Sequence, residues 1–198
     1  TSDRSQLGRP IEVATLTADS PSPPTAVALT ADGRTIAIAT DDGAVFLVDT
    51  ATAQVRRRLE VAESAVSSVE FSRDGKLLAA GRLDGRTMLY NVSTGGVAGP
   101  PLAASASGIT DVSFSPDGTR LATVSADRTG GFWRLDGGRA VGIALDGHDA
   151  PVTEAAFSPD GSRLVTVGLD AKIIVRDPRT GAVTATIAKA TCKHNGGK

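Results

Sequence analysis

The pentamer FSPDG occupies residues 114–118 and returns unchanged at residues 157–161. Two related pentamers, FSRDG at residues 71–75 and LTADG at residues 29–33, keep its Asp-Gly pair. The Asp residues of the four copies are separated by 42, 43 and 43 residues: Asp32, Asp74, Asp117 and Asp160. A period of about 40–45 residues is typical of propeller blades, whereas helical repeats have periods of about 33 or 34 residues.

A second Asp follows each of these residues by ten positions and keeps the same period: Asp42, Asp84, Asp127 and Asp170. Two series with one period define a repeating unit. The order of strands within a unit is clearest in its third copy, at residues 109–114, 120–125, 130–135 and 139–145. The first of these segments, ITDVSF, alternates apolar and polar residues, as a half-buried strand does.

The pentamer supplies the turn between the first two strands. Pro116 fixes φ at the first corner, Asp117 can bond to its own backbone, and Gly118 accepts a positive φ. Because no segment shows the apolar spacing of a helix, the sequence predicts an all-β protein built from four-stranded antiparallel blades. Four blades are expected, at residues 24–65, 66–108, 109–151 and 152–188.

Composition excludes several classes of function. The chain has 198 residues, with 21 Lys and Arg against 22 Asp and Glu, so its net charge of −1 gives no general attraction to nucleic acid or to an anionic membrane. No stretch approaches the roughly 18 apolar residues of a membrane span. The single cysteine, Cys192, excludes an internal disulfide framework and fits a reducing compartment, so we expect a cytoplasmic location.

These residues resemble the WD-repeat (tryptophan-aspartate repeat) β-propellers, in a degenerate, bacterial-type form. The likeness covers residues 24–188. Besides the pentamer it rests on Ser-Ala-Asp at 125–127, Phe-Trp at 132–133, Arg-Asp at 176–177 and Asp-Gly-His at 146–148. In that family a His, a Ser or Thr, an Asp and a Trp of one blade form a buried hydrogen-bonded tetrad.

The resemblance implies remnants of this tetrad rather than complete copies. They are Thr40 and Asp42 in the first blade, Asp84 in the second, Ser125, Asp127 and Trp133 in the third, and His148 and Asp170 in the fourth. The third blade has Ser105 in place of His, and the fourth has Gly168 and Arg176 in the other two places. We expect Trp133 to be largely buried near Ser125, and stability to come mainly from aliphatic packing between sheets.

A preceding segment, RPIEVATL at residues 9–16, reads as the outer strand of another blade, so residues 1–23 are expected to hold that strand and a linker. Residues 189–198 are expected to be a disordered tail. Since the last blade already has its own outer strand, we expect the four blades to be part of a larger ring, typically of about seven or eight blades. We also expect self-association through the open blade edges.

The sequence offers little chemistry. His148 and His194 have no second ligand at metal spacing, and Cys192 with His194 supplies two ligands where a tetrahedral site needs four. We therefore predict no catalytic residue, no metal and no cofactor. Val69, Val112 and Ala155, expected to face the central channel, are apolar, which argues against an enzymatic channel.

The leading hypothesis is a non-catalytic protein-interaction scaffold or sensory domain of a larger bacterial signalling protein. Family likeness implies that loops on one rim bind the partner, a protein rather than nucleic acid or a membrane. The candidate rim residues are Asp41, Arg82, Leu83, Asp111, Ala126, Glu154 and Leu169. Residues 30–59 also resemble the YVTN-type repeats of some bacterial propellers, so a lactonase-like enzyme or oxidoreductase domain is the alternative. A purely structural spacer is a third possibility.

Overall fold

The computed structural model describes residues 22–59, 64–103, 105–136 and 139–188. These residues form sixteen strands in four sheets and contain no helix, which confirms the predicted all-β class. Accordingly, no helix in this part of the chain is long and apolar enough to cross a membrane. The strand predicted at residues 9–16 and the tail predicted at residues 189–198 lie outside the described residues.

Each sheet is an antiparallel meander of four strands in chain order. The first contains β1 (Pro24–Leu29), β2 (Thr35–Thr40), β3 (Val45–Asp49) and β4 (Val55–Leu59). The second contains β5 (Val66–Phe71), β6 (Leu77–Arg82), β7 (Arg86–Asn91) and β8 (Leu102–Ala103). The third contains β9 (Ile109–Phe114), β10 (Arg120–Ser125), β11 (Gly130–Asp136) and β12 (Arg139–Ala144). The fourth contains β13 (Val152–Phe157), β14 (Leu164–Gly168), β15 (Lys172–Arg176) and β16 (Val183–Ala188).

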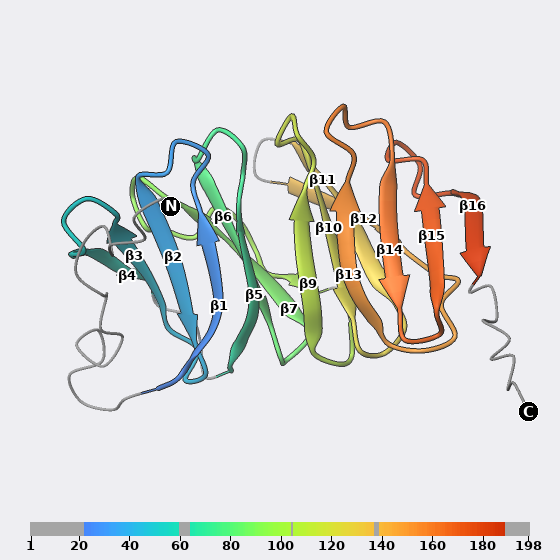
Figure 1. The fold of residues 1–198 in the computed structure, drawn as a ribbon, viewed down its shortest axis with the longest axis horizontal. Coiled ribbons are helices and arrows are strands. Elements are labelled where there is room, and N and C mark those ends of the chain that lie inside the picture. Colours follow the sequence, from blue (N-terminus) through green and yellow to red (C-terminus); the bar gives the residue numbers. More distant parts are fainter. Residues whose placement is uncertain (1–21, 60–63, 104, 137–138, 189–198) are drawn as a thin grey trace, which may run out of the picture.

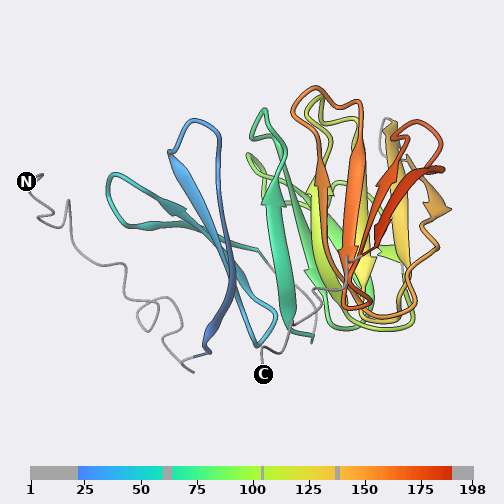
Figure 2. The same ribbon diagram turned by 45° about the vertical axis from the view of Figure 1, so that its right-hand side comes forward.

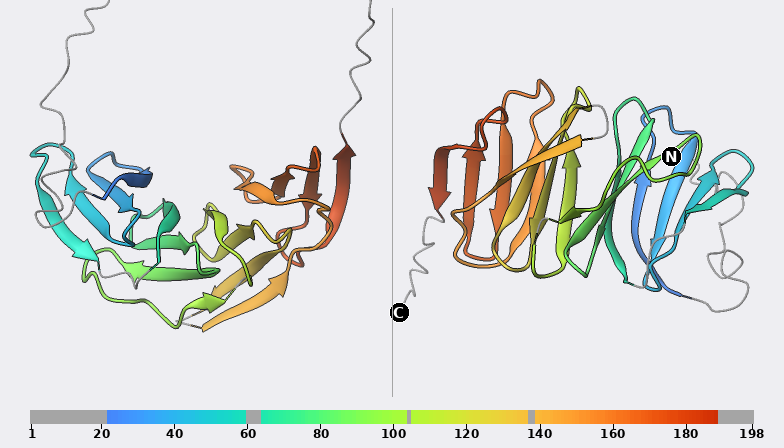
Figure 3. Two further views of the ribbon diagram at one scale, coloured as in Figure 1. Left: turned by 90° about the horizontal axis from the view of Figure 1, so that it is seen from below. Right: turned by 180° about the vertical axis from the view of Figure 1, so that it is seen from behind.

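The four sheets stand side by side along an arc, as blades do in a propeller (Figure 1). Figure 2 shows the same sheets turned, with the first and the last at opposite ends. Seen from below, the arc is U-shaped and open, with the inner strands β1, β5, β9 and β13 on its concave side (Figure 3). The molecule is therefore a partial β-propeller.

The turn between the first two strands of each sheet is held by one arrangement of hydrogen bonds. In the third sheet Ser115 Oγ donates to Asp117 Oδ1 (2.5 Å) and accepts from the backbone amide of Arg120 (2.9 Å). Asp117 Oδ1 also accepts from the amide of Thr119 (3.0 Å), and Gly118 takes a φ of +69°. The pairs Thr30 with Asp32, Ser72 with Asp74 and Ser158 with Asp160 repeat the hydroxyl-to-carboxylate bond. The repeated pentamer thus encodes a repeated turn.

The hydroxyl bond is also the main reason why the pKa of each turn carboxylate is lowered. For Asp160 the pKa falls to about 2. A lowered pKa means that the ionised form is favoured in the folded state, so these turns lose stability when the pH falls below the ordinary value near 3.8.

The core lies between successive sheets rather than within any one of them. Ala79 and Leu89 of the second sheet pack against Val112 and Phe114 of the third. The third and fourth sheets pack in the same way, through Ala122, Val124 and Phe132 of the third sheet and Val152, Ala155 and Leu164 of the fourth. Each inner sheet is therefore apolar on both faces.

The prediction that Val69, Val112 and Ala155 face the channel is correct only in part. All three are buried in the clusters between sheets, since each is at most 7% exposed. Val69 and Ala155 also line the groove on the concave surface, where they alternate with polar side chains of the inner strands.

The turn arrangement leads to a testable difference between two equivalent serines. Ser115 is buried whereas Ser158 is half-buried, although both make the same bonds. Ser115→Ala should lower the free energy of unfolding by about 1–2 kcal/mol, because it leaves a buried amide without its acceptor. Ser158→Ala should lower the free energy of unfolding by less, because water can take the place of the hydroxyl as the acceptor. Urea denaturation measures both, and equal losses would contradict a burial-dependent role.

Candidate functional site

The best-preserved polar network lies in the fourth sheet, at one rim of the arc. His148 Nδ1 is 3.1 Å from both carboxylate oxygens of Asp170, and His148 Nε2 is 3.0 Å from Thr166 Oγ1. Burial alone would raise the pKa of Asp170, but the amides of Asp149 and Lys172 and the His148 ring lower it to about 2. The histidine thus ties the loop before β13 to the turn after β14.

The structure corrects the position of the tetrad hydroxyl. It belongs to Thr166 in the fourth sheet and Thr123 in the third, four residues before the Asp rather than two. Trp133 Nε1 donates to Thr123 Oγ1 (3.0 Å), so the hydrogen-bond partner of the indole is Thr123 rather than Ser125. The indole is partly buried and packs against the cluster between the second and third sheets, as predicted. A Thr-Val pair four residues before the Asp occurs in both sheets and was the signal in the sequence.

The indole reaches Thr123 because Gly131 leaves room for it. A Cβ atom on Gly131 would lie 2.5 Å from Trp133 Nε1, so the ring covers this glycine. Gly131 is the cross-strand partner of Thr123, and the ring therefore ends beside that hydroxyl.

Two serines replace the histidine in the third sheet. Ser105 Oγ donates to Asp127 Oδ2 (2.5 Å) and lies 2.6 Å from Ser125 Oγ. Burial would raise the pKa of Asp127, but the hydroxyls of Ser105 and Thr129 lower it to about 2. The equivalent of Ser125 in the fourth sheet is Gly168, where a Cβ atom would lie 2.6 Å from His148 Nδ1.

The remaining two Asp residues take other partners. Thr40 Oγ1 donates to Asp42 Oδ1 (2.6 Å) in the first sheet, and Arg82 Nη2 lies 2.6 Å from Asp84 Oδ2 in the second. Arg82 is buried and its charge is paired, so the prediction that it belongs to the exposed rim is wrong. The Asp is constant in all four sheets, and the group that holds it varies.

Four turns between the second and third strands project from this rim and are called here the rim turns. Asp41, Leu83, Ala126 and Leu169 occupy the same position in them, and all four are exposed. Leu83 is 57% exposed and Leu169 is 70% exposed. The other two rim candidates, Asp111 and Glu154, lie within β9 and β13 and line the groove on the concave face instead of the rim.

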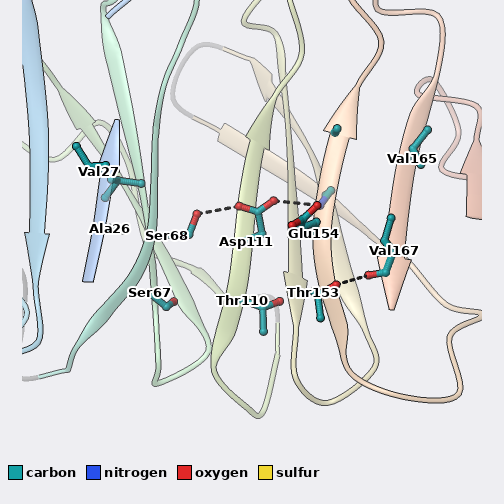
Figure 4. A pocket seen from close by; sticks show the side chains of 13 residues that line it. Ala26, Val27, Ser67, Ser68, Thr110, Asp111, Thr153, Glu154, Val165 and Val167 are labelled. Atoms are coloured by element: carbon teal, nitrogen blue, oxygen red, sulfur yellow. Dashed lines mark hydrogen bonds between the residues drawn. The ribbon is translucent and has the colours of Figure 1, made fainter. Parts of the chain in front are cut away.

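The concave face carries a groove of about 520 Å³. Its polar lining comes from the inner strands (Figure 4), through the residues Ser67, Ser68, Thr110, Asp111, Thr153 and Glu154. Ser68 Oγ donates to Asp111 Oδ1 (2.9 Å), and Asp111 Oδ2 accepts from the amide of Ala155 (3.0 Å). One carboxylate therefore links three successive sheets.

A β-bulge at the start of each inner strand explains this lining. The register of each strand shifts by one residue, at Thr25, Ser67, Thr110 and Thr153. We call these four residues the bulge hydroxyls. A bulge turns the extra side chain away from the regular ladder. Thr25 Oγ1 donates to the Val66 carbonyl (2.5 Å) and Thr110 Oγ1 to the Val152 carbonyl (2.6 Å), each in the following sheet.

The groove is acidic, with Asp111 and Glu154 in its lining, and two carboxyl groups of the inner strands, Asp111 and Glu70, have perturbed pKa values. Burial raises the pKa of Asp111. Burial also raises the pKa of Glu70 to about 7, with a smaller contribution from the charge of Asp111, although the Phe114 amide donates to this carboxyl group. Among the residues that the structure describes, no three His, Cys, Asp or Glu side chains gather in a way that could hold a metal ion. Cys192 and His194 lie outside those residues.

Asp127 is held by serines and Asp170 by a histidine, which predicts an energetic coupling between positions 148 and 168. Gly168→Ser should destabilise the protein by about 1–3 kcal/mol, because the new side chain collides with the His148 ring. His148→Ser should also destabilise it, because Thr166 and Asp170 lose their partner. The double variant recreates the serine pair of the third sheet.

We expect the double variant to lose less free energy of unfolding than the two single variants lose together, by about 1–2 kcal/mol. Chemical denaturation of all four proteins gives this coupling energy. Gly168→Ser combined with the distant Ser115→Ala is the control and should be additive. If the losses caused by the Gly168 and His148 substitutions simply add, the two side chains do not compete for the same volume.

Glu70 predicts a pH dependence of stability. Its pKa of about 7 in the folded protein exceeds its ordinary value of 4.5. The protonated carboxyl group therefore stabilises the fold fully below pH 4.5, and this contribution is lost as the pH rises through about 7. Glu70→Gln should reduce this decline in the denaturation midpoint with pH. Asp41→Asn, which removes an exposed carboxylate in a rim turn, is the control and should leave the decline unchanged. An unchanged decline in Glu70→Gln would exclude Glu70 as its source.

Comparisons with known proteins agree with this architecture. The family model described as Vps8 beta-propeller matches residues 18–150, which is more than half of the chain. The model described as WD domain, G-beta repeat, matches residues 140–177, the segment that contains His148, Thr166 and Asp170. Comparison with curated proteins finds no significant match. The chain therefore belongs to the Vps8 beta-propeller family, within the WD-repeat β-propellers.

Proposed function

We propose that the chain is a non-catalytic scaffold that binds a partner protein at the rim turns. Two exposed leucines at one repeat position, Leu83 and Leu169, carry this proposal. WD-repeat propellers in general serve as protein-interaction scaffolds, and both matching family models support that general role here.

The rim turns hold these leucines in fixed positions. The backbone amide of Leu83 donates to the Ala65 carbonyl (3.0 Å), and that of Leu169 donates to the Pro151 carbonyl (2.9 Å). The following residues, Asp84 and Asp170, are anchored by the side-chain contacts described above. An exposed apolar side chain on a rigid turn loses little entropy on binding, which favours its use as a contact residue.

Charges around Leu169 are mixed rather than uniformly basic. Asp149 and Lys172 form an ion pair beside this turn, at 2.5 Å. Such a surface suits a protein segment that offers an apolar side chain with polar neighbours, and it lacks the basic patch by which nucleic acid is attracted.

We place this scaffold in the cytoplasm, as the repeat region of a larger bacterial signalling protein. Support comes from the single cysteine, from the excess of 16 Arg over 5 Lys and from the resemblance to bacterial WD-repeat arrays. An enzymatic role is not proposed, because Glu70 and Asp111 accept hydrogen bonds from amides of the next sheet instead of facing a nucleophile or a base.

A peptide-display library selected against the chain tests the rim. Binding of the selected peptides, measured by calorimetry, should weaken about tenfold or more when Leu83→Ser and Leu169→Ser are combined, because two apolar contacts are lost. Val97→Ser is the matched control, since Val97 is 55% exposed in the second sheet but lies outside the rim turns. Peptides that bind the rim variant and the wild type equally would refute the assignment.

A further inference from the structure

The two end sheets of the arc expose side chains that are buried at every interface inside it. Val27 and Leu29 of the first sheet are 70% and 56% exposed. Their equivalents one repeat later, Val69 and Phe71, are each 7% exposed, because the first sheet covers them. In the part of the chain that the structure describes, no further sheet covers this outer face of the first sheet.

The fourth sheet exposes the complementary face, which at each internal interface packs against the following sheet. Val165 and Val167 are partly exposed, whereas their equivalents Ala122 and Val124 are fully buried against the fourth sheet. Ile173 on the same face is 37% exposed. One chain thus carries both halves of one more interface, at its two ends.

The bulge hydroxyls show how the two halves would be joined. At each internal interface a bulge hydroxyl donates to the carbonyl that begins the next inner strand, as Thr25 does to Val66 and Thr110 to Val152. Thr153 is next in this series, and it donates to Val167 of its own sheet (3.2 Å). The carbonyl in the matching position at the other end of the arc belongs to Pro24.

A second hydrogen bond is also repeated at successive interfaces, between a side chain of one inner strand and a backbone amide of the next. Ser68 Oγ accepts from the amide of Val112 (3.3 Å), and Asp111 Oδ2 accepts from the amide of Ala155 (3.0 Å), in both cases across an interface. Glu154 is the next acceptor in this series and is exposed. The amide that would meet it is that of Val27.

Side-chain sizes also match between the two ends. A Cβ atom on Gly81 would lie 2.6 Å from Ile109 Cγ2 and 3.0 Å from Val112 Cγ1, so this position faces those two residues in the next sheet. The equivalent position at the end of the arc is Val167, and the residues opposite it are Pro24 and Val27. The larger Val167 would meet the smaller Pro24, which conserves the volume of the interface.

We propose that two copies of this chain close one ring, with the fourth sheet of each copy packed on the first sheet of the other. The arc is U-shaped, so both ends open toward the same side (Figure 3). A half-turn about the ring axis then brings each end of one copy to the opposite end of the second copy. Closed cyclic symmetry satisfies both interfaces at once and gives eight blades. This inference is independent of the proposed partner site, because the leucines of the rim turns are not part of these interfaces.

Light scattering during size-exclusion chromatography of the full chain tests the ring. We expect a mass of twice 20.1 kDa for the wild type. Val27→Lys and Val167→Glu should each give a folded monomer, because either change places an unpaired charge in the interface. Val97→Lys, in the middle of the arc, should remain a dimer.

Mixing the two monomeric variants separates a broken interface from a misfolded protein. An equimolar mixture can form a heterodimer with one wild-type interface and one interface in which the introduced lysine and the introduced glutamate are paired, so the mass should return to that of a dimer. A wild-type monomer at every concentration, dimers of both single variants, a mass above that of two chains, or no dimer in the mixture would overturn the proposal.

Discussion

The packing of one sheet upon the next is the contact on which the whole structure depends. An isolated four-stranded sheet with two apolar faces is unstable in water, because the hydrophobic effect favours burial of both faces against other sheets. The repeat meets this requirement with small residues on one face, such as Ala79 and Ala122, and larger residues on the other, such as Val112 and Phe114. Burying each large side chain contributes about 1.5–3 kcal/mol, so the interfaces outweigh any single polar contact.

Polar side chains serve two different purposes around this packing. In the turns of the repeated pentamer the partners are two to five residues apart, and the same bonds are found in every sheet. In the rim turns the partner of the Asp differs from sheet to sheet. It is a threonine or an arginine two residues earlier in the first and second sheets, and a serine or a histidine of the preceding loop in the third and fourth. The pentamer therefore fixes the first set of bonds, whereas the second set is made by different donors at different distances along the chain.

This difference explains what could be predicted from the sequence. The period, the strands and the pentamer turns follow from neighbouring residues, and the fold class was predicted correctly. The partner of Trp133 could not be predicted, because it depends on the space above Gly131 and on the cross-strand position of Thr123. The burial of Arg82 depends on its ion pair with Asp84. Asp111 and Glu154 were expected at the rim and instead line the groove, because a bulge, which has no clear sequence pattern, precedes them in their strands.

The bond between His148 and Asp170 also bears on how such a chain can evolve. His148 precedes β13, whereas Asp170 follows β14, so the network belongs to one sheet although its first member lies outside that sheet. Ser105 and Asp127 have the same relation to the third sheet. A gene segment that is duplicated or exchanged keeps its network only if it starts before the loop and extends past the following rim turn. The genetic unit is therefore offset from the structural blade, and a break point between His148 and β13 would separate residues that have to change together.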